Sequence, residues 1–167
     1  AVPYGDKILY AGDFTKGRTE GKALTLLDPA TGESEVLSRE NAFIRTAVPY
    51  GDKILYAGDF TKGYKEGFAL TLLDSATGKS EVLVRENDFI RTVALYGDEI
   101  LYAGDFTKFC EYHALILLYP KTRDFSILEW QNNRIFTAVP YGDKILYASA
   151  LTKYNGDCDL TLLDPST

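Results

Sequence analysis

Three aspartates stand in one recurring setting and are the first candidates for ligand chemistry. The segment Gly-Asp-Phe-Thr-Lys occurs in three copies, and each copy supplies a carboxylate and an ammonium group. These residues are Asp13, Lys16, Asp59, Lys62, Asp105 and Lys108. A carboxylate accepts hydrogen bonds from hydroxyl groups and an ammonium group donates them. Both groups therefore suit a polar, hydroxyl-rich ligand.

A second recurring group follows later in each copy, in the segments SREN, VREN and EWQN. Together with one tyrosine of a neighbouring loop, it supplies Arg39, Asn41, Tyr64, Arg85, Asn87, Trp130 and Asn132. Guanidinium, amide and aromatic groups complete a set that holds sugar hydroxyls and stacks on the C–H surface of a sugar. A structural alternative stays open, in which each Asp accepts a backbone N–H two residues on and each Asn stabilises a turn.

The elements that position these residues recur about every 46 residues. The segment AVPYGDKILYAGDFTK occurs unchanged at 1–16 and 47–62, and variants of it begin at Val93 and Ala138. Within a copy, we expect strands over 43–51, 53–61, 68–78 and 79–87, because short β-branched and aromatic runs end in Gly-Asp or Asp-x-x-x-Gly turns. No sustained helical periodicity is present, so helix content should be close to nil.

Four antiparallel strands in a repeat of this length are typical of one blade of a β-propeller. A β-trefoil uses repeats of similar size but needs three copies, and this chain holds more. The pattern ILYAGDF, ALTLLDPATG, SEVL resembles the common propeller module in which an "lyv" strand precedes a "vldpatG" hairpin. The resemblance covers the whole chain and implies an all-β propeller similar to small lectin-type propellers.

We therefore predict a single all-β propeller domain over 1–167, with blades at 1–46, 47–92, 93–137 and 138–167. The last copy stops before its outer strand, so we expect the last blade to be incomplete. The ring is then either four-bladed or half of an eight-bladed ring that two chains complete. An open ring exposes apolar blade faces, which predicts a homo-oligomer.

Sequence variation among the copies is concentrated at one end of the blades. The turns YGDK and DPATG change little, whereas the loops after the second strand read KGRTEGK, KGYKEGF, KFCEYH and KYNGDCD. Long loops tolerate change and commonly carry binding residues, so we place the ligand sites at this end. The fourth copy replaces the recurring Asp and Phe by Ala150 and Leu151, which predicts that its site is empty.

Other chemistry has little support in the sequence. We expect no catalytic residues, no metal and no cofactor, because no pair of carboxylates stands out and no Asp-rich calcium loop is present. We expect the single histidine, His113, to be exposed and solvated. Cys110 and Cys158 lie in equivalent loops of adjacent blades and could form a disulfide, which would indicate an oxidising, secreted or extracellular location.

The chain carries a net charge of −6 and has no cluster of Lys or Arg. Such a surface disfavours nucleic acid, and no apolar run is long enough to insert in a membrane. The chain contains no Met, so we expect a processed, trimmed or incompletely determined product. We expect a non-enzymatic lectin whose repeated sites bind carbohydrate. The alternative is a protein-interaction scaffold, or an engineered or recently amplified repeat without a natural ligand.

Overall fold

The structure is a computed structural model of the chain. It describes residues 1–16, 19–40, 44–62, 65–86, 89–106, 112–150 and 158–166. These residues form strands and turns and contain no helix, as the sequence predicts. Within them, therefore, no helical segment has the length and apolarity needed to cross a membrane.

The strands of the described residues follow the repeat closely. They are β1 (Val2–Tyr4), β2 (Lys7–Lys16), β3 (Thr19–Leu27), β4 (Ser34–Glu40), β5 (Ile44–Tyr50), β6 (Lys53–Lys62), β7 (Lys65–Asp74), β8 (Ser80–Glu86), β9 (Ile90–Tyr96), β10 (Glu99–Phe106), β11 (Tyr112–Leu118), β12 (Phe125–Gln131), β13 (Ile135–Tyr141), β14 (Lys144–Ala150) and β15 (Cys158–Leu163). The predicted strands of the second copy agree with β5 to β8 to within a few residues.

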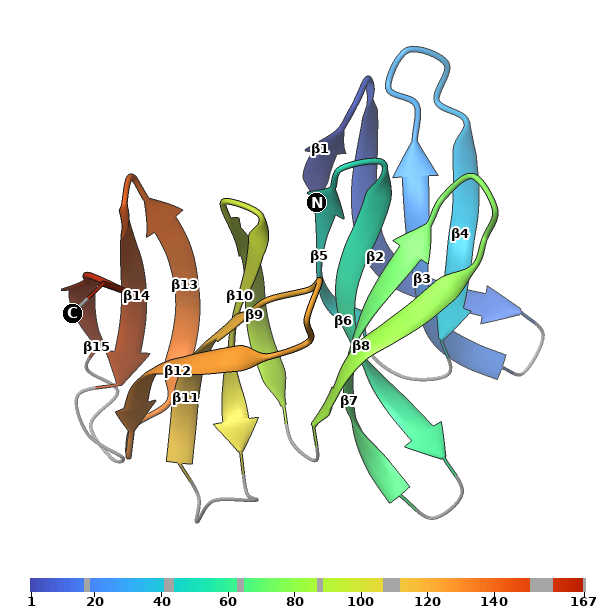
Figure 1. Ribbon diagram of the computed structural model, residues 1–167. Helices are drawn as coiled ribbons and strands as arrows, with labels where there is room; N and C mark the ends of the chain where they lie inside the picture. Colours follow the sequence, from blue (N-terminus) through green and yellow to red (C-terminus); the bar gives the residue numbers. More distant parts are fainter. Residues whose placement is uncertain are drawn as a thin grey trace. The chain divides into compact units, whose positions relative to one another are not determined.

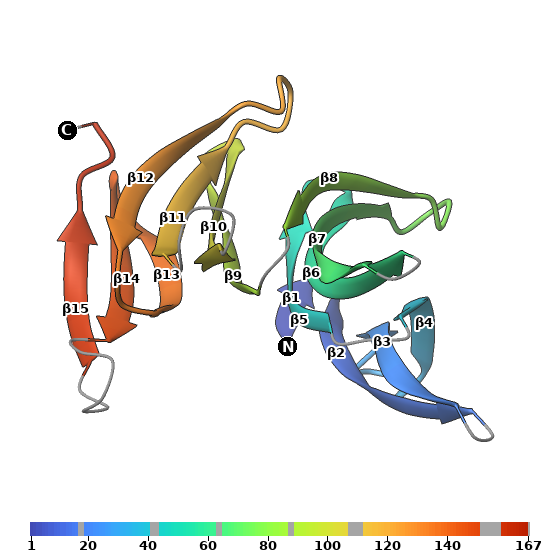
Figure 2. The ribbon, with the colours of Figure 1, turned by 90° about the horizontal axis from the view of Figure 1, so that it is seen from below.

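Neighbouring strands in the sequence pair in antiparallel fashion and build four separate sheets (Figure 1). The sheets are β1–β4, β5–β8, β9–β12 and the three-stranded β13–β15, and we call them blades 1 to 4. The predicted four-stranded blades and the shorter last blade are thereby confirmed. The chain divides into two compact units, unit 1 over Ala1–Arg85 and unit 2 over Glu86–Thr167. In unit 2, the first strands of blades 3 and 4 lie side by side (Figure 2).

The turn between the third and fourth strands of blades 1 to 3 is stabilised by hydrogen bonds within the turn itself. In blade 1, the Asp28 carboxylate accepts the backbone N–H groups of Ala30 at 2.8 Å and Thr31 at 3.2 Å. Gly32 closes this turn at φ 75°, a left-handed conformation that suits glycine. Blade 3 has the same turn, but Arg123 takes the left-handed position at φ 63°.

A β-bulge interrupts the pairing of the first two strands in blades 2, 3 and 4. In blade 3, Thr92 pairs with Ala103 and Ile90 with Gly104, so Arg91 is the extra residue. Arg45 takes the same position in blade 2 and Phe136 takes it in blade 4. A bulge bends the strand and redirects the extra side chain. This redirection determines which groups meet at the variable-loop end.

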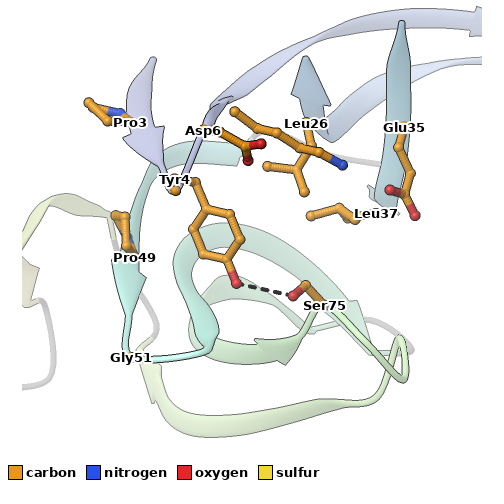
Figure 3. Close-up of a pocket in the computed structure, with 11 residues that line it drawn as sticks. Pro3, Tyr4, Asp6, Leu26, Glu35, Leu37, Pro49, Gly51 and Ser75 are labelled. Carbon is orange, nitrogen blue, oxygen red and sulfur yellow. Dashed lines mark hydrogen bonds between the residues drawn. The ribbon is translucent and has the colours of Figure 1, made fainter. Parts of the chain in front are cut away.

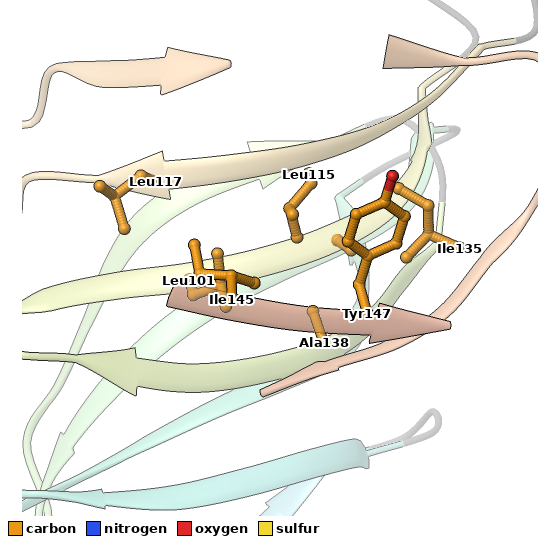
Figure 4. Packing of buried hydrophobic residues seen from close by; sticks show 8 residues of the cluster. Leu101, Leu115, Leu117, Ile135, Ala138, Ile145 and Tyr147 are labelled. Atoms are coloured by element: carbon orange, nitrogen blue, oxygen red, sulfur yellow. The ribbon is translucent and has the colours of Figure 1, made fainter. Parts of the chain in front are cut away.

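Each unit has its own apolar core between its two blades. In unit 1, leucines of blade 1 pack against Ile44, Ile54, Tyr56 and Leu73 of blade 2. In unit 2, Figure 4 shows leucines of blade 3 against Ile135, Ala138, Ile145 and Tyr147 of blade 4. The two cores use equivalent positions of the repeat.

Candidate functional site

The predicted site aspartate of blade 3 lies in a cluster of charged groups at the variable-loop end of unit 2. Arg91 donates from Nε to Oδ1 of Asp105 at 2.9 Å, and its Nη2 forms a second hydrogen bond to Oδ2. The two side chains are 21% and 16% exposed. Two parallel hydrogen bonds between a guanidinium and a carboxylate fix the geometry of both groups. Asp105 is therefore held by the bulged strand β9 beside it.

His113 also contacts this carboxylate. Its Nδ1 lies 2.6 Å from Oδ1 of Asp105, and its side chain is 15% exposed. The sequence-based expectation of an exposed, solvated histidine was wrong. Asp105 and His113 are directly opposite each other on β10 and β11, so cross-strand pairing brings the two side chains together. A lone histidine gives no sign of this in the sequence until the strand register is known.

The pKa of Asp105 reflects these contacts. Burial alone would raise the pKa of this carboxyl group, because it disfavours the charged form. The hydrogen bond and charge of Arg91, followed by those of His113, outweigh burial and bring the pKa below its ordinary value. The carboxylate is thus stabilised in its charged form.

Polar side chains lie opposite one another across β10, β11 and β12, and the last of them contacts blade 4. Gln131 on β12 is opposite His113 and donates from Nε2 to the hydroxyl of Tyr147 in blade 4 at 2.8 Å. One repeat earlier, the equivalent tyrosine, Tyr102, donates to Oε1 of Glu86 at 3.3 Å. Burial, followed by the charge of Glu86, raises the pKa of Tyr102, which keeps this phenol protonated. Gln131 therefore ties blade 3 to blade 4 within unit 2, and Glu86 takes the same position in the repeat.

Blade 4 shows what replaces the charged pair. Its bulge position holds Phe136 in place of Arg91, and Ala150 stands in place of Asp105. The backbone is retained, because Ala150 N donates to the carbonyl of Arg134 at 2.9 Å as Asp105 N donates to that of Phe89. Arginine and aspartate are thus lost together, which favours a structural partnership between them. In blade 2, the Arg45 guanidinium lies 5.4 Å from the Phe68 ring centre.

The structure describes the other predicted ligand residues unevenly. Trp130 is 42% exposed on β12, Asn132 is exposed after it, and Arg85 is exposed on β8. Asp13, Lys16, Arg39, Asp59 and Lys62 lie on described strands, but their side chains are outside the described part. Asn41, Tyr64, Asn87, Lys108 and Cys110 fall outside the described residues. Cys158 begins β15 and is exposed. Because Cys110 falls outside the described residues, the predicted disulfide stays a prediction.

The structure also has an open groove that the sequence reasoning missed. It lies in unit 1 at the opposite, tight-turn end of blades 1 and 2 and encloses about 500 Å³ (Figure 3). Its polar and charged lining residues are Tyr4, Asp6, Lys7, Glu35 and Ser75. Its apolar lining comes from Pro3, Leu26, Leu37 and Pro49. This volume falls within the usual range for small-molecule sites.

Two hydrogen bonds fix the orientation of the Tyr4 ring in this groove. Its hydroxyl donates to the backbone carbonyl of Asp52 at 2.9 Å and lies 3.1 Å from Oγ of Ser75. Since the Tyr4 proton points to Asp52, the serine hydroxyl is the donor in the second bond. The other three blades carry Pro29, Pro120 and Pro165 where blade 2 carries Ser75. That single departure from the repeat was the available signal for this site.

No arrangement suited to a metal ion is found in the part of the chain that the structure describes. A cluster of three or more His, Cys, Asp or Glu side chains able to hold a metal does not occur there. The groups present form hydrogen bonds and ion pairs with one another or line the groove. This arrangement can bind a polar ligand.

No family model and no curated protein matches this chain. Solved structures do match. TolB from Acinetobacter baumannii is 16% identical with a TM-score of 0.66, over 86% of this chain and 35% of that one. A chain of a nidogen/laminin complex is 13% identical with a TM-score of 0.65, over 90% and 56%. An oligogalacturonate lyase in complex with manganese is 14% identical with a TM-score of 0.57, over 89% and 40%.

These similarities concern the fold. The first two matches are β-propeller proteins, and this chain has the same kind of consecutive antiparallel blades. The predicted all-β propeller is therefore confirmed, and the trefoil alternative is excluded. The chain spans between 35% and 56% of the length of these three chains. Because unrelated functions share the propeller fold, function must be argued from the sites.

Proposed function

We propose that this protein is a non-enzymatic carbohydrate-binding propeller, a lectin, and that the groove of unit 1 holds the sugar. The observation that carries the proposal is the combination of one fixed aromatic ring with charged groups around it. Tyr4 lies in the groove, and Asp6, Lys7 and Glu35 line the same space. This combination matches the two surfaces of a sugar, which are its hydroxyl edge and its C–H face.

The charged groups suit hydroxyl recognition. Asp6 and Glu35 are exposed carboxylates that accept hydrogen bonds, and the ammonium group of Lys7 donates them. Hydrogen bonds to charged groups are the stronger ones, at about 1.5–3 kcal/mol each in proteins. Leu26, which is 5% exposed, contributes an apolar surface to the groove. A ring that is already fixed loses little freedom when a ligand stacks on it.

The equivalent position in unit 2 differs in charge. Tyr96 donates to the backbone carbonyl of Asp143, as Tyr4 does to that of Asp52. However, Glu99 stands in place of Lys7 and Ser126 in place of Glu35. The charge of this surface in unit 2 therefore differs from that of the groove in unit 1.

The variable-loop end is the weaker candidate among the described residues. The Asp105 carboxylate already accepts hydrogen bonds from Arg91 and contacts His113, so a ligand hydroxyl would compete with both. Trp130 and Asn132 are exposed there and form a second proposed contact surface. The proposal therefore places the main binding contribution in the groove.

A glycan array followed by titration calorimetry tests the proposal. One glycan class should bind, and Glu35→Gln should weaken it about tenfold, which corresponds to about 1.4 kcal/mol. Glu33→Gln is the matched control, because Glu33 is exposed on the same blade but does not line the groove. Silence across the array would overturn the lectin and favour the protein-interaction scaffold. Equal weakening by both variants would remove the groove from the proposal.

A further inference from the structure

Each unit forms one blade-to-blade interface, and the two interfaces are equivalent. We call the surface formed by Leu9, Leu24 and Leu26 in blade 1, and by Leu101, Leu115 and Leu117 in blade 3, the leucine face. It packs against the surface that we call the tyrosine face. This is Ile54, Tyr56 and Leu73 in blade 2, and Ile145, Tyr147 and Leu163 in blade 4. The repeat thus encodes a complementary pair of faces on every blade.

Among the residues that the structure describes, none covers the leucine face of blade 4 in this way. By its place in the repeat, this face consists of Leu146, Leu160 and Leu162. Leu160 is 66% exposed and Leu162 is 48% exposed, whereas Leu24 and Leu115, at the position of Leu160, are 0% exposed. Two large apolar side chains in adjacent positions of one strand face are therefore in contact with water. Exposed apolar patches of this kind commonly mark interaction surfaces.

The tyrosine face of blade 1 is the matching surface. It consists of Ile8, Tyr10 and Leu27, all of which are partly exposed. At the same positions, blade 2 buries Ile54 to 0%, Tyr56 to 5% and Leu73 to 2% exposure. The residue types are identical at all three positions, so the shape and polarity that bind a leucine face are retained.

We propose that the leucine face of blade 4 binds the tyrosine face of blade 1 of a second copy of this chain. The contact would repeat, between chains, the interface that the chain forms within unit 1 and within unit 2. It is heterologous, because two different surfaces meet, and it arranges copies head to tail. The proposal does not depend on carbohydrate binding. A bound sugar would, however, meet several groove copies on one assembly.

Multi-angle light scattering and sedimentation over a range of concentrations test the assembly. The wild type should exceed the monomer mass of 18.6 kDa, and the Leu160→Asp/Leu162→Asp variant should return to it with unchanged circular dichroism. Phe125→Asp is the matched control, because Phe125 is 57% exposed but lies on blade 3 and belongs to neither face. Its mass should equal that of the wild type.

Mixing two defective variants tests the head-to-tail orientation. Leu160→Asp/Leu162→Asp blocks the face on blade 4, and Ile8→Lys blocks the face on blade 1. Neither variant should associate alone, and an equimolar mixture should give a complex of twice the monomer mass. Hydrogen exchange of wild-type β15 amides supplies a readout without variants, since their protection should rise with protein concentration.

A wild type that stays at 18.6 kDa at every concentration would overturn the proposal. With protected β15 amides, that result would show that the face is covered within one chain. With unprotected amides, it would show that the face stays in water. A mixture that fails to form the complex, while the wild type associates, would overturn the head-to-tail arrangement.

Discussion

Arg91 and Asp105 meet in a two-bonded ion pair because a β-bulge makes Arg91 the extra residue of β9. Blade 4 carries Phe136 and Ala150 at these two positions, and it keeps the equivalent backbone hydrogen bond, from Ala150 N to the carbonyl of Arg134. The pair is thus a replaceable unit of the blade. Its members are expected to depend on each other energetically.

A double-mutant cycle measures this dependence. Arg91→Phe or Asp105→Ala alone should lower the free energy of unfolding by about 1.5–3 kcal/mol, because each leaves a partly buried charge without its partner. The double variant reproduces the pair of blade 4 and should cost less than the sum. Urea denaturation measures all four proteins. Asp98→Ala should have no measurable effect, since the Asp98–Lys121 ion pair is 92% and 87% exposed. Strict additivity of the two single variants would contradict the coupling.

The lowered pKa of Asp105 predicts a dependence of stability on pH. Its pKa in the folded protein is below the ordinary value of 3.8, so the unfolded chain takes up the proton first as the pH falls. The stabilisation is therefore complete above pH 3.8 and is lost as the pH falls through the lowered pKa. The stability difference between wild type and Asp105→Asn should be largest at neutral pH and should shrink in acid. Urea denaturation at several pH values measures it, and a constant difference would contradict the assignment.

Much of the fold could be predicted from the sequence, because the turns and strands of each repeat depend on residues that are close together in the chain. The Gly-Asp hairpins and the Asp28 turn depend on residues adjacent in the chain, and both occur as expected. The blade count followed from the same repetition. The fourth copy, which lacks the aspartate, still forms its strands β13 to β15 as predicted.

The candidate sites were harder to predict because they depend on register and on distant residues. The Arg91–Asp105 pair requires a one-residue bulge in β9, which no local sequence pattern predicts. His113 contacts Asp105 only because the register of β10 and β11 places the two residues opposite each other. The groove requires Tyr4 to meet the carbonyl of Asp52, 48 residues away. Such a contact arises from the packing of one blade on the next.

Gly104 on β10 lies close to the backbone of Phe89, the residue just before β9. A Cβ atom at Gly104 would lie 2.2 Å from the carbonyl oxygen of Phe89, so the backbone would have to shift. Gly104→Ala should therefore lower the free energy of unfolding by about 1–3 kcal/mol. Ser149→Ala is the control at the same position of blade 4, where a Cβ already exists, and it should cost much less. Thermal unfolding compares the two, and equal losses would contradict the steric explanation.

Arg123 occupies a left-handed position that glycine fills in the two earlier blades. Its φ of 63° disfavours a side chain, whereas Gly32 and Gly78 take φ 75° and 68° at equivalent turns. Arg123→Gly should raise the free energy of unfolding by about 1 kcal/mol, because the steric penalty at this φ disappears. Lys121→Gly in the same turn adds only backbone freedom and should not stabilise. A lower melting temperature for Arg123→Gly would contradict this prediction.

Tyr4 contacts the hydroxyl of Ser75 in unit 1. In unit 2 the position of Ser75 is taken by Pro165, which has no hydroxyl group. Tyr4→Phe removes the hydroxyl that binds both Asp52 and Ser75, whereas Tyr96→Phe removes one that binds the carbonyl of Asp143. Tyr4→Phe should therefore cost about 0.5–1.5 kcal/mol more than Tyr96→Phe, the usual contribution of one hydrogen bond. In the background of Ser75→Ala this difference should disappear. Denaturation of the wild type, the two tyrosine variants and the same three proteins with Ser75→Ala measures it, and a difference that survives Ser75→Ala would show that the serine does not hold the ring.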